Sequence, residues 1–279
     1  MKKISRRSFL AAAGLSVAAL ALTACGGSSA STASSVASSA ASSEAASTSA
    51  AAGELTTVEA GKLTMATNAT FPPYEMTTDT GAFEGIDVDT AQAIAEKLGL
   101  ELQIDDMEFD AALLSVQQGK ADIVMAGVTV TDERKAVMDF SDSYATGIQS
   151  IIVPEGSDIA TPDDLAGKKI GTQRGTTGYI YCSDDFGDEN VVAYDSGLTA
   201  VQALNNGQVD AVVIDNAPAQ EYVAANPGLV VLDTSYAEED YAIGMAKGSA
   251  LEDAINAALE ELKADGTLQS IVDKYITAE

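Results

Sequence analysis

Short apolar runs and amphipathic stretches alternate along the chain after residue 62. Asp87 or Asp89 is a candidate N-cap for the first amphipathic stretch, and Gly99 stands just past its end. Strands separated by helices indicate βαβ units and an open, mostly parallel sheet. The pattern predicts strands at 63–67, 100–105 and 121–127, and helices at 88–99 and 110–119.

A second series of alternating elements occupies the middle of the chain. It begins where Thr161 can cap a helix that has Pro162 in its first position, and it ends with an apolar strand at 229–233. A further strand at 241–246 and two C-terminal helices follow, and we expect them to return to the first series. The pattern predicts an α/β protein with two lobes, two chain crossings and a cleft between the lobes.

The two series share a repeated phrase. Residues 111–127 align without gaps on residues 199–215, and each copy has a helix ending at glycine, an aspartate in the turn and a buried strand. The alignment places Gly127 and Asp215 at the carboxyl ends of matching strands, where open α/β sheets bind ligands. A generic αβ unit has the same layout, so a coincidence stays open.

The N-terminal part of the chain has a different character. Residues 1–24 have a basic start, an apolar run and a small-residue end before Cys25, which is the layout of an export signal peptide. The run is too short to span a membrane. Its end resembles the lipobox of bacterial lipoproteins, which implies cleavage before Cys25 and lipidation of its sulfur. Arg6 and Arg7 also resemble a twin-arginine signal, so both the Sec and the twin-arginine routes stay open.

The residues after Cys25 form a tether rather than a core. They are almost entirely Ser, Ala and Thr, which cannot bury enough apolar surface to fold. We expect the working protein to follow, with hinges near 148–153 and 238–243. The expected segments are a tether at 25–54, a first lobe at 55–148 plus 239–279, and a second lobe at 149–238.

Composition removes several kinds of chemistry. The 279 residues contain 15 Lys plus Arg against 42 Asp plus Glu, and no histidine. Such an acidic surface repels nucleic acid, so no nucleic-acid partner is expected. Without histidine, a Ser-His-Asp triad, a His-ligated metal and a His-ligated haem are excluded. We therefore expect no metal and no cofactor.

A family resemblance extends over residues 60–279, and six phrases carry it. They are FPPYEM at 71–76, GAFEGIDVD at 81–89, FDAALLSVQQGKADI at 109–123, AGVTVTDERKAVMDFSDSY at 126–144, DLAGKKIGTQRGTTG at 164–178 and GQVDAVVID at 207–215. In this order they resemble the bacterial extracellular solute-binding proteins of family 3, which serve polar amino-acid ABC transporters. The resemblance implies a two-lobed, type II periplasmic-binding-protein-like fold, with helices on both faces of each sheet.

The resemblance also implies the ligand site. Arg134 grips the ligand α-carboxylate, which suits the bidentate geometry of a guanidinium group. Asp215 takes the α-ammonium group. The rings of Phe71 and Phe109 sandwich the ligand side chain, with Tyr74 close by. Further contacts are expected from Asn68, Gly127, Thr129, Arg174, Thr176 and Thr177.

Simpler roles for these residues stay open. Arg134 could be a surface arginine at a helix start, paired with Asp132 or Glu133. Phe71 and Phe109 could pack in the core without touching a ligand. The carboxylate of Asp87 could cap a helix as well as contact a ligand.

Two positions bear on ligand specificity. Several relatives that bind cationic amino acids carry an acid where this chain has the neutral Asn68. Arg174, at the lip of a glycine-rich turn, would further disfavour a cationic side chain. The sequence therefore favours a neutral polar ligand such as glutamine, with an acidic ligand possible. Alternatively, Arg174 faces solvent and carries no information about the ligand.

The implied function is extracytoplasmic binding of a polar L-amino acid and its delivery to an ABC importer permease with its ATPase subunits. We expect a monomer held by the lipid on Cys25 at the outer face of the cell membrane. One alternative is a ligand-sensing subunit of a membrane receptor. Another is a dehydratase-like enzyme with Glu75, Glu84 or Asp87 as its acid or base. The spacing suggests no second catalytic partner, so we expect no enzyme and no catalytic residue.

Overall fold

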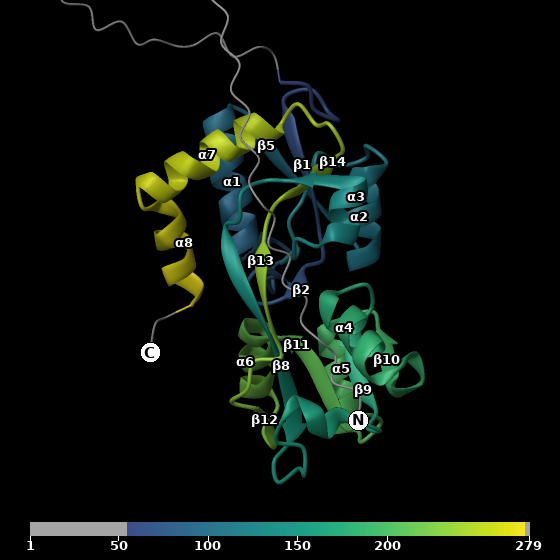
Figure 1. The fold of residues 1–279 in the computed structure, drawn as a ribbon. Helices are drawn as coiled ribbons and strands as arrows, with labels where there is room; N and C mark the ends of the chain where they lie inside the picture. Colours follow the sequence, from purple (N-terminus) through teal and green to yellow (C-terminus); the bar gives the residue numbers. More distant parts are fainter. Residues whose placement is uncertain (1–54, 277–279) are drawn as a thin grey trace, which may run out of the picture. The chain divides into compact units, whose positions relative to one another are not determined.

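Two β-sheets organise residues 55–276, which are the residues that the computed structural model describes (Figure 1). The predicted signal peptide, Cys25 and tether lie outside them. The first sheet has the order β5 (Glu101–Asp106), β1 (Lys62–Thr67), β6 (Ile123–Val124), β14 (Gly244–Ala246) and β7 (Met138–Phe140). The second has the order β10 (Val191–Tyr194), β9 (Ile170–Gln173), β11 (Ala211–Asp215), β8 (Ala145–Pro154) and β12 (Leu229–Val231), and β13 (Ala237–Tyr241) also pairs with β8.

The remaining elements are a small sheet and the helices. The small sheet contains β2 (Thr70–Phe71), β3 (Glu75–Thr77) and β4 (Phe83–Glu84). The helices are α1 (Ile86–Leu98), α2 (Phe109–Gln117), α3 (Asp132–Val137), α4 (Thr177–Phe186), α5 (Gly197–Asn205), α6 (Asn216–Ala225), α7 (Glu252–Ala264) and α8 (Thr267–Tyr275). Two 3-10 turns, η1 (Pro162–Leu165) and η2 (Asp188–Asn190), complete the set. None of the helices within residues 55–276 has the length and apolar character needed to cross a membrane.

Both large sheets are mixed. In the first, β1 pairs in parallel with β5 and β6, whereas β14 is antiparallel to β6 and β7. In the second, β9 pairs in parallel with β10 and β11, whereas β8 is antiparallel to β11, β12 and β13. The predicted mostly parallel pattern therefore holds for only one half of each sheet. An apolar run carries no information about strand direction, and strands that are not joined by a crossover helix can pair antiparallel.

Side chains alternate between the two faces of each sheet, and each face has its own core. In β1, Leu63 and Met65 pack into the core that includes residues of α1 and α7, while Ala66 packs into the core formed with α2. Figure 1 shows α1 and α2 on opposite sides of β1. In β8, Ile152 packs into the core on one face of the sheet, and its neighbours Ile151 and Val153 pack into the core on the other face. Burial on both faces explains why the strands read as continuous apolar runs.

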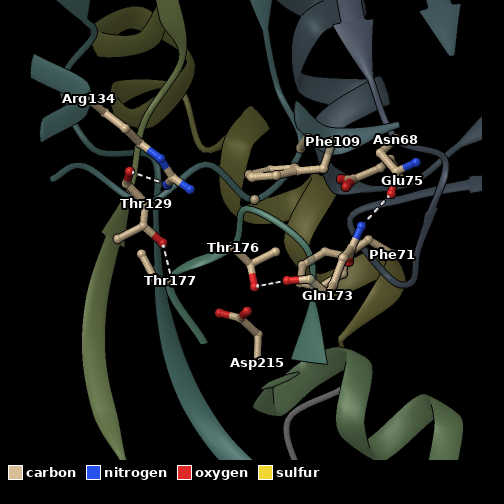
Figure 2. A pocket seen from close by; sticks show the side chains of 12 residues that line it. Asn68, Phe71, Glu75, Phe109, Thr129, Arg134, Gln173, Thr176, Thr177 and Asp215 are labelled. Atoms are coloured by element: carbon tan, nitrogen blue, oxygen red, sulfur yellow. Dashed lines mark hydrogen bonds between the residues drawn. The ribbon is translucent and has the colours of Figure 1, made fainter. Parts of the chain in front are cut away.

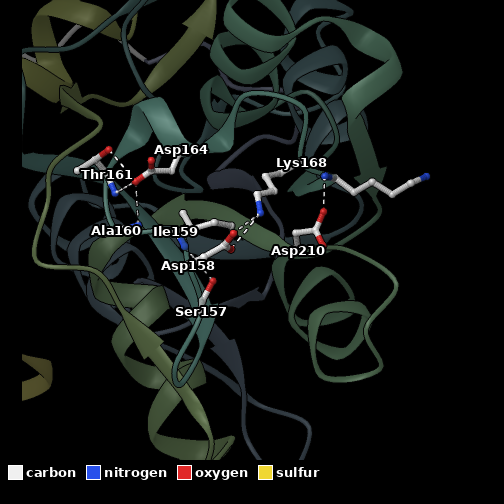
Figure 3. A network of polar contacts seen from close by, with 9 residues as sticks. Ser157, Asp158, Ile159, Ala160, Thr161, Asp164, Lys168 and Asp210 are labelled. Carbon is white, nitrogen blue, oxygen red and sulfur yellow. Dashed lines mark hydrogen bonds and ion pairs between the residues drawn. The ribbon is translucent and has the colours of Figure 1, made fainter.

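The predicted helix ends are confirmed in two places and wrong in one. Gly99 ends α1 in a left-handed conformation, with φ of 70°. Thr161 and Asp164 form a capping box around η1, with Pro162 in its first turn (Figure 3). Neither Asp87 nor Asp89 is the N-cap, because α1 starts at Ile86, directly after Gly85, and both aspartates lie inside its first turn.

The predicted strand at 241–246 is two strands. Tyr241 ends β13, which pairs with β8 in the second sheet, and Gly244 begins β14, which belongs to the first. The chain therefore passes between the sheets here and again where β7 leads into β8. The lobe boundaries and the hinges remain predictions.

The repeated phrase is also repeated in three dimensions. Asp122 accepts a hydrogen bond from the backbone N–H of Thr64 at 2.8 Å, and Asp210 accepts one from Lys169 N–H at 2.7 Å (Figure 3). Each aspartate also donates its own backbone N–H to the carbonyl oxygen of the same partner. Both carboxylates thus fasten the turn after a helix to the start of the neighbouring parallel strand.

Candidate functional site

A small cavity lies between residues that follow strands of the first sheet and residues of the second (Figure 2). Every predicted ligand contact lines it except Tyr74 and Arg174, and three further residues join them. The lining residues are Asn68, Phe71, Glu75, Phe109, Ala126, Gly127, Thr129, Arg134, Gln173, Thr176, Thr177 and Asp215.

Strand ends and helix starts bring these residues together. Gln173 and Asp215 are the last residues of β9 and β11, and Asn68 directly follows β1. Phe109 and Thr177 are the first residues of α2 and α4. Parallel strands end at the same edge of a sheet, and the helices that follow them start there. Polar and aromatic side chains from both sheets therefore line one cavity.

Arg134 is the cation of the cavity. Its side chain is only 8% exposed, and its guanidinium lies over the Phe109 ring at 5.4 Å from the centroid. Nη1 donates to the carbonyl oxygen of Thr129 at 2.7 Å, and Nη2 donates to that of Gly175 at 3.1 Å. Burial lowers the pKa of Arg134, and the nearby Glu239 carboxylate opposes this change. The alternative of a surface arginine paired with a neighbouring acid is wrong, since the group is buried.

Asp215 is the anion at the end of β11. It is buried, and its two carboxylate oxygens accept hydrogen bonds from Tyr241 Oη and from Gln149 Nε2, the latter at 2.8 Å. Burial raises the pKa of Asp215 to about 7, against the hydrogen bond from Tyr241, and the negative charge of Glu239 adds to the increase. A cation placed beside this carboxyl group would favour its ionised form.

Glu75 is a lining residue that the sequence did not predict as a ligand contact. It is fully buried on β3, and neither of its carboxyl oxygens has a hydrogen-bond partner. Burial and the neighbouring carboxylate of Asp87 hold the pKa of Glu75 well above its usual range. A buried, unpartnered carboxyl group at a cavity wall is costly unless a ligand satisfies it. The available signal was an acid inside the otherwise apolar phrase FPPYEM.

Asp87 supports this wall from behind. Its carboxylate accepts a 2.9 Å hydrogen bond from Gly127 N–H and a 2.7 Å bond from Tyr144 Oη. Burial raises the pKa of Asp87 to about 6, although both hydrogen bonds act in the opposite direction. Asp87 does not line the cavity and fixes the backbone at Gly127 instead.

Gln173, also missed from the sequence, joins the two halves of the cavity. Its Nε2 donates to Asn68 Oδ1 at 2.8 Å, and Asn68 Nδ2 donates to the carbonyl oxygen of Met107, also at 2.8 Å. The amide of Asn68 is thus engaged on both of its polar atoms. No sequence signal distinguished Gln173 from a surface glutamine.

Tyr74 and Arg174 are placed differently from expectation. The ring of Tyr74 packs behind Phe71, with ring centroids 6.0 Å apart, and against Tyr241 at 5.3 Å. The side chain of Arg174 is 56% exposed and lies 3.7 Å from the carboxylate of Asp195. Arg174 therefore faces solvent, as in the alternative left open by the sequence, and its side chain does not line the cavity.

Comparisons with known proteins agree with the fold. A family model for bacterial extracellular solute-binding proteins, family 3, matches residues 63–278. A probable histidine-binding protein of Neisseria gonorrhoeae is 34% identical over 96% of this chain and 95% of its own length. An arginine-, lysine-, histidine-binding protein of Geobacillus stearothermophilus shares 35% identity, with a TM-score of 0.75 over 78% of this chain and 96% of its own. An ancestral arginine-binding protein bound to glutamine shares 42% identity, with a TM-score of 0.75 over 78% of this chain and 99% of its own.

These similarities extend over nearly all of the described residues. The structural matches confirm the predicted fold class, the type II periplasmic-binding-protein fold. The predicted family resemblance is confirmed as well. From its sequence match, its fold and its cavity, the chain belongs to the bacterial extracellular solute-binding proteins, family 3.

Proposed function

We propose that this protein binds a polar L-amino acid as a zwitterion in the cavity and delivers it to the permease of an ABC importer. One observation carries the proposal, namely that the cavity holds a buried arginine and a buried aspartate that do not pair with each other. Arg134 and Asp215 approach the cavity from different elements, α3 and β11 (Figure 2). A ligand with a carboxylate at one end and an ammonium group beside it satisfies both charges.

The α-carboxylate would bind at Arg134. The two hydrogen bonds to carbonyl oxygens use one hydrogen on each Nη atom, so Nε–H and one hydrogen on each Nη remain for a ligand. The first turn of α4, which begins at Thr177, adds unpaired backbone N–H groups and the positive end of the helix dipole. These donors suit an anion and would repel an ammonium group.

The ligand side chain would point toward Glu75. No protein group donates a hydrogen bond to this carboxyl group, and the amide of Asn68 is already engaged by Gln173 and Met107. A side chain that ends in N–H donors would satisfy Glu75, and a guanidinium or ammonium group would also favour the ionised form of Glu75 and pair with it. We therefore favour a cationic ligand of the arginine or lysine class over the neutral one that the sequence suggests.

Glutamine remains the second candidate. Its side-chain amide can donate to Glu75 without carrying charge, and the arginine-binding relative bound to glutamine has the same fold. The argument for a neutral ligand loses one of its two supports, because Arg174 faces solvent. The remaining support is the neutral Asn68, but the buried carboxyl group of Glu75 favours a cationic ligand side chain instead.

The cellular setting rests on the sequence and the family. The family description is extracellular, which agrees with an export signal at residues 1–24. The lipid on Cys25, anchorage at the outer face of the membrane and a monomeric state are proposals from the sequence. A ligand-sensing subunit would use the same cavity, so only identification of the membrane partner separates it from transport. The enzyme alternative is set aside, because the family consists of solute-binding proteins.

The experiment is a calorimetric titration of the chain without residues 1–24, with Cys25→Ser to prevent lipidation. The probes are the twenty L-amino acids, ornithine, citrulline and cystine. We expect saturable 1:1 binding of L-arginine or L-lysine, with weaker binding of L-glutamine. An L-amino acid at about 100 times its Kd should also raise the free energy of unfolding by about 2.7 kcal/mol. Absence of binding across the panel would overturn the proposal.

A further inference from the structure

Glu239 on β13 is a buried acid that does not line the cavity and that no ligand contact proposed above uses. Its side chain is only 6% exposed. Its Oε2 accepts three hydrogen bonds of 3.0 Å, one each from Thr129 Oγ1, Thr177 Oγ1 and Gln149 Nε2. All three donors reach Oε2 and favour the ionised form of this carboxyl group, so Glu239 places a negative charge at the back of the site, although its other oxygen, Oε1, is buried without a hydrogen-bond partner.

The three donors connect Glu239 to both charged residues of the cavity. The carbonyl oxygen of Thr129 accepts from Arg134 Nη1 at 2.7 Å, and Gln149 Nε2 also donates to Asp215 Oδ2 at 2.8 Å. Thr129 therefore connects Glu239 to Arg134, the proposed carboxylate-binding residue, and Gln149 connects Glu239 to Asp215, the proposed ammonium-binding residue. Its strand lies in one of the two segments that pass between the sheets.

The charge of Glu239 fixes which atoms its neighbours present. A hydroxyl group has one hydrogen, and Thr129 and Thr177 both direct theirs to Glu239, which leaves only lone pairs for a ligand. Lone pairs accept from an ammonium group and repel a carboxylate. Gln149 likewise places its NH₂ group between the carboxylates of Glu239 and Asp215, because its carbonyl oxygen would be repelled there.

We propose that Glu239 is a positioning residue, whose carboxylate orients the hydroxyls of Thr129 and Thr177 and the amide of Gln149 so that they receive a ligand ammonium group beside Asp215. This inference rests on the proposed function, because it needs a ligand that carries an ammonium group. It assigns Glu239 no direct contact with the ligand.

An effect on Asp215 separates this role from simple packing. Asp215 faces Glu239 and Tyr241 on β13 and Gln149 on β8. The charge of Arg134 on α3 is also near, as are the titratable groups of Glu75 on β3 and of Tyr74 just before it. Glu239 raises the pKa of Asp215, so neutralising Glu239 lowers it. Asp215 must be ionised to hold an ammonium group. In the parent, affinity therefore falls as pH falls below about 7, and without the charge of Glu239 this decline starts at a lower pH.

The test compares Glu239→Gln with the control Glu238→Gln. Glu238 is the exposed neighbour on the same strand, so its replacement removes the same charge from the opposite face. Binding of L-arginine, and of L-glutamine in parallel, is measured by calorimetry from about pH 5 to about pH 8, a range in which Asp215 titrates. Glu75 and Asp87 titrate near the same cavity in every variant, so the difference between variants reports on Asp215.

We expect Glu239→Gln to weaken binding at about pH 8 by about 10-fold to 100-fold, since bonds to a charged acceptor are lost. We also expect it to move the midpoint of the pH dependence downward. Glu238→Gln should leave both quantities unchanged. Unchanged affinity in Glu239→Gln would overturn the proposal, and so would weaker binding with an unmoved midpoint, which indicates only structural damage.

Glu239→Asp keeps the test decisive if the glutamine variant does not fold. It retains the charge and shortens the side chain by one methylene group, so we expect weaker binding with the parental midpoint. Parental affinity in this variant would contradict a positioning role. The proposed function is judged separately, because it fails if the parent protein binds no amino acid at all.

Discussion

Gln173 Nε2 donates a 2.8 Å hydrogen bond to Asn68 Oδ1, and this bond links the end of β9 in the second sheet to the residue after β1 in the first. It is accompanied by a second link of the same kind, from Arg134 Nη2 to the carbonyl oxygen of Gly175. Polar groups on the first-sheet side of the cavity therefore form hydrogen bonds with polar groups on the second-sheet side. The ligand adds to these links rather than forming the only bridge.

Replacing Gln173 by alanine should weaken ligand binding by about 10-fold, because a buried cross-link is lost and Asn68 Oδ1 loses one of its donors. Calorimetric titration with the preferred amino acid measures the change. Gln202→Ala, on the exposed face of α5, is the control and should bind like the parent. Equal affinities for the two variants would contradict a role for this bond in ligand binding.

Arg134→Ala should cost about 2 to 5 kcal/mol of binding free energy, or about 30-fold to several thousand-fold in Kd. The reason is that the ligand carboxylate would lose its only buried cationic partner in the cavity lining. Arg174→Ala provides a matched control, because its guanidinium is exposed and weakly paired. If the two alanine variants bind alike, Arg134 does not hold the ligand.

Glu75→Gln should change ligand preference rather than abolish binding. We expect the Kd for L-arginine to rise by about 10-fold or more, since a charge-assisted bond becomes a neutral one, while the Kd for L-glutamine changes little. Glu84→Gln on the neighbouring strand β4 is the control. A parallel loss for both ligands would indicate a packing defect, and no loss for either would remove Glu75 from the site.

Gly127→Ala tests the shape of the cavity wall. Gly127 has φ of 54°, and an added Cβ would lie 2.9 Å from a Phe71 ring atom, so alanine introduces backbone strain and displaces the ring. Gly207→Ala carries similar strain, with φ of 67°, but meets no neighbouring atom within 4 Å. Thermal unfolding should show a loss of about 1 to 2 kcal/mol for both variants. Only Gly127→Ala should also lose ligand affinity, and equal affinities would show that the ring is free to adjust.

The ligand-free protein should be less stable at neutral pH than in mild acid. Folding raises the pKa of Asp87 to about 6 and that of Asp215 to about 7, so the folded state holds protons that the unfolded state releases. The free energy of unfolding should therefore fall as pH rises from about 4 to about 7, by about 2 to 4 kcal/mol for each group at most. Urea unfolding at a series of pH values measures this slope. Asp215→Asn should flatten it, and a slope that stays the same would show that Asp215 does not titrate in this range.

The sequence by itself determined the elements and most of the cavity lining. Apolar periodicity predicts helices and strands because it depends only on which side of a local element is buried. The phrases around Arg134 and Asp215 point to a family whose fold and function follow from many matched positions. Export of the chain is also a local property of residues 1–24, although it remains a prediction.

Only the tertiary structure decided which charged groups are buried and what they contact. Nothing local distinguishes Arg134 from Arg174, or Glu239 from Glu238, yet one of each pair is buried and the other exposed. The hydrogen-bond donors to Glu239 lie 62, 90 and 110 residues away along the chain. The cost of burying a charge depends on such distant partners, so the roles of Glu75 and Glu239 become visible only when the fold brings those partners, or a cavity, beside them.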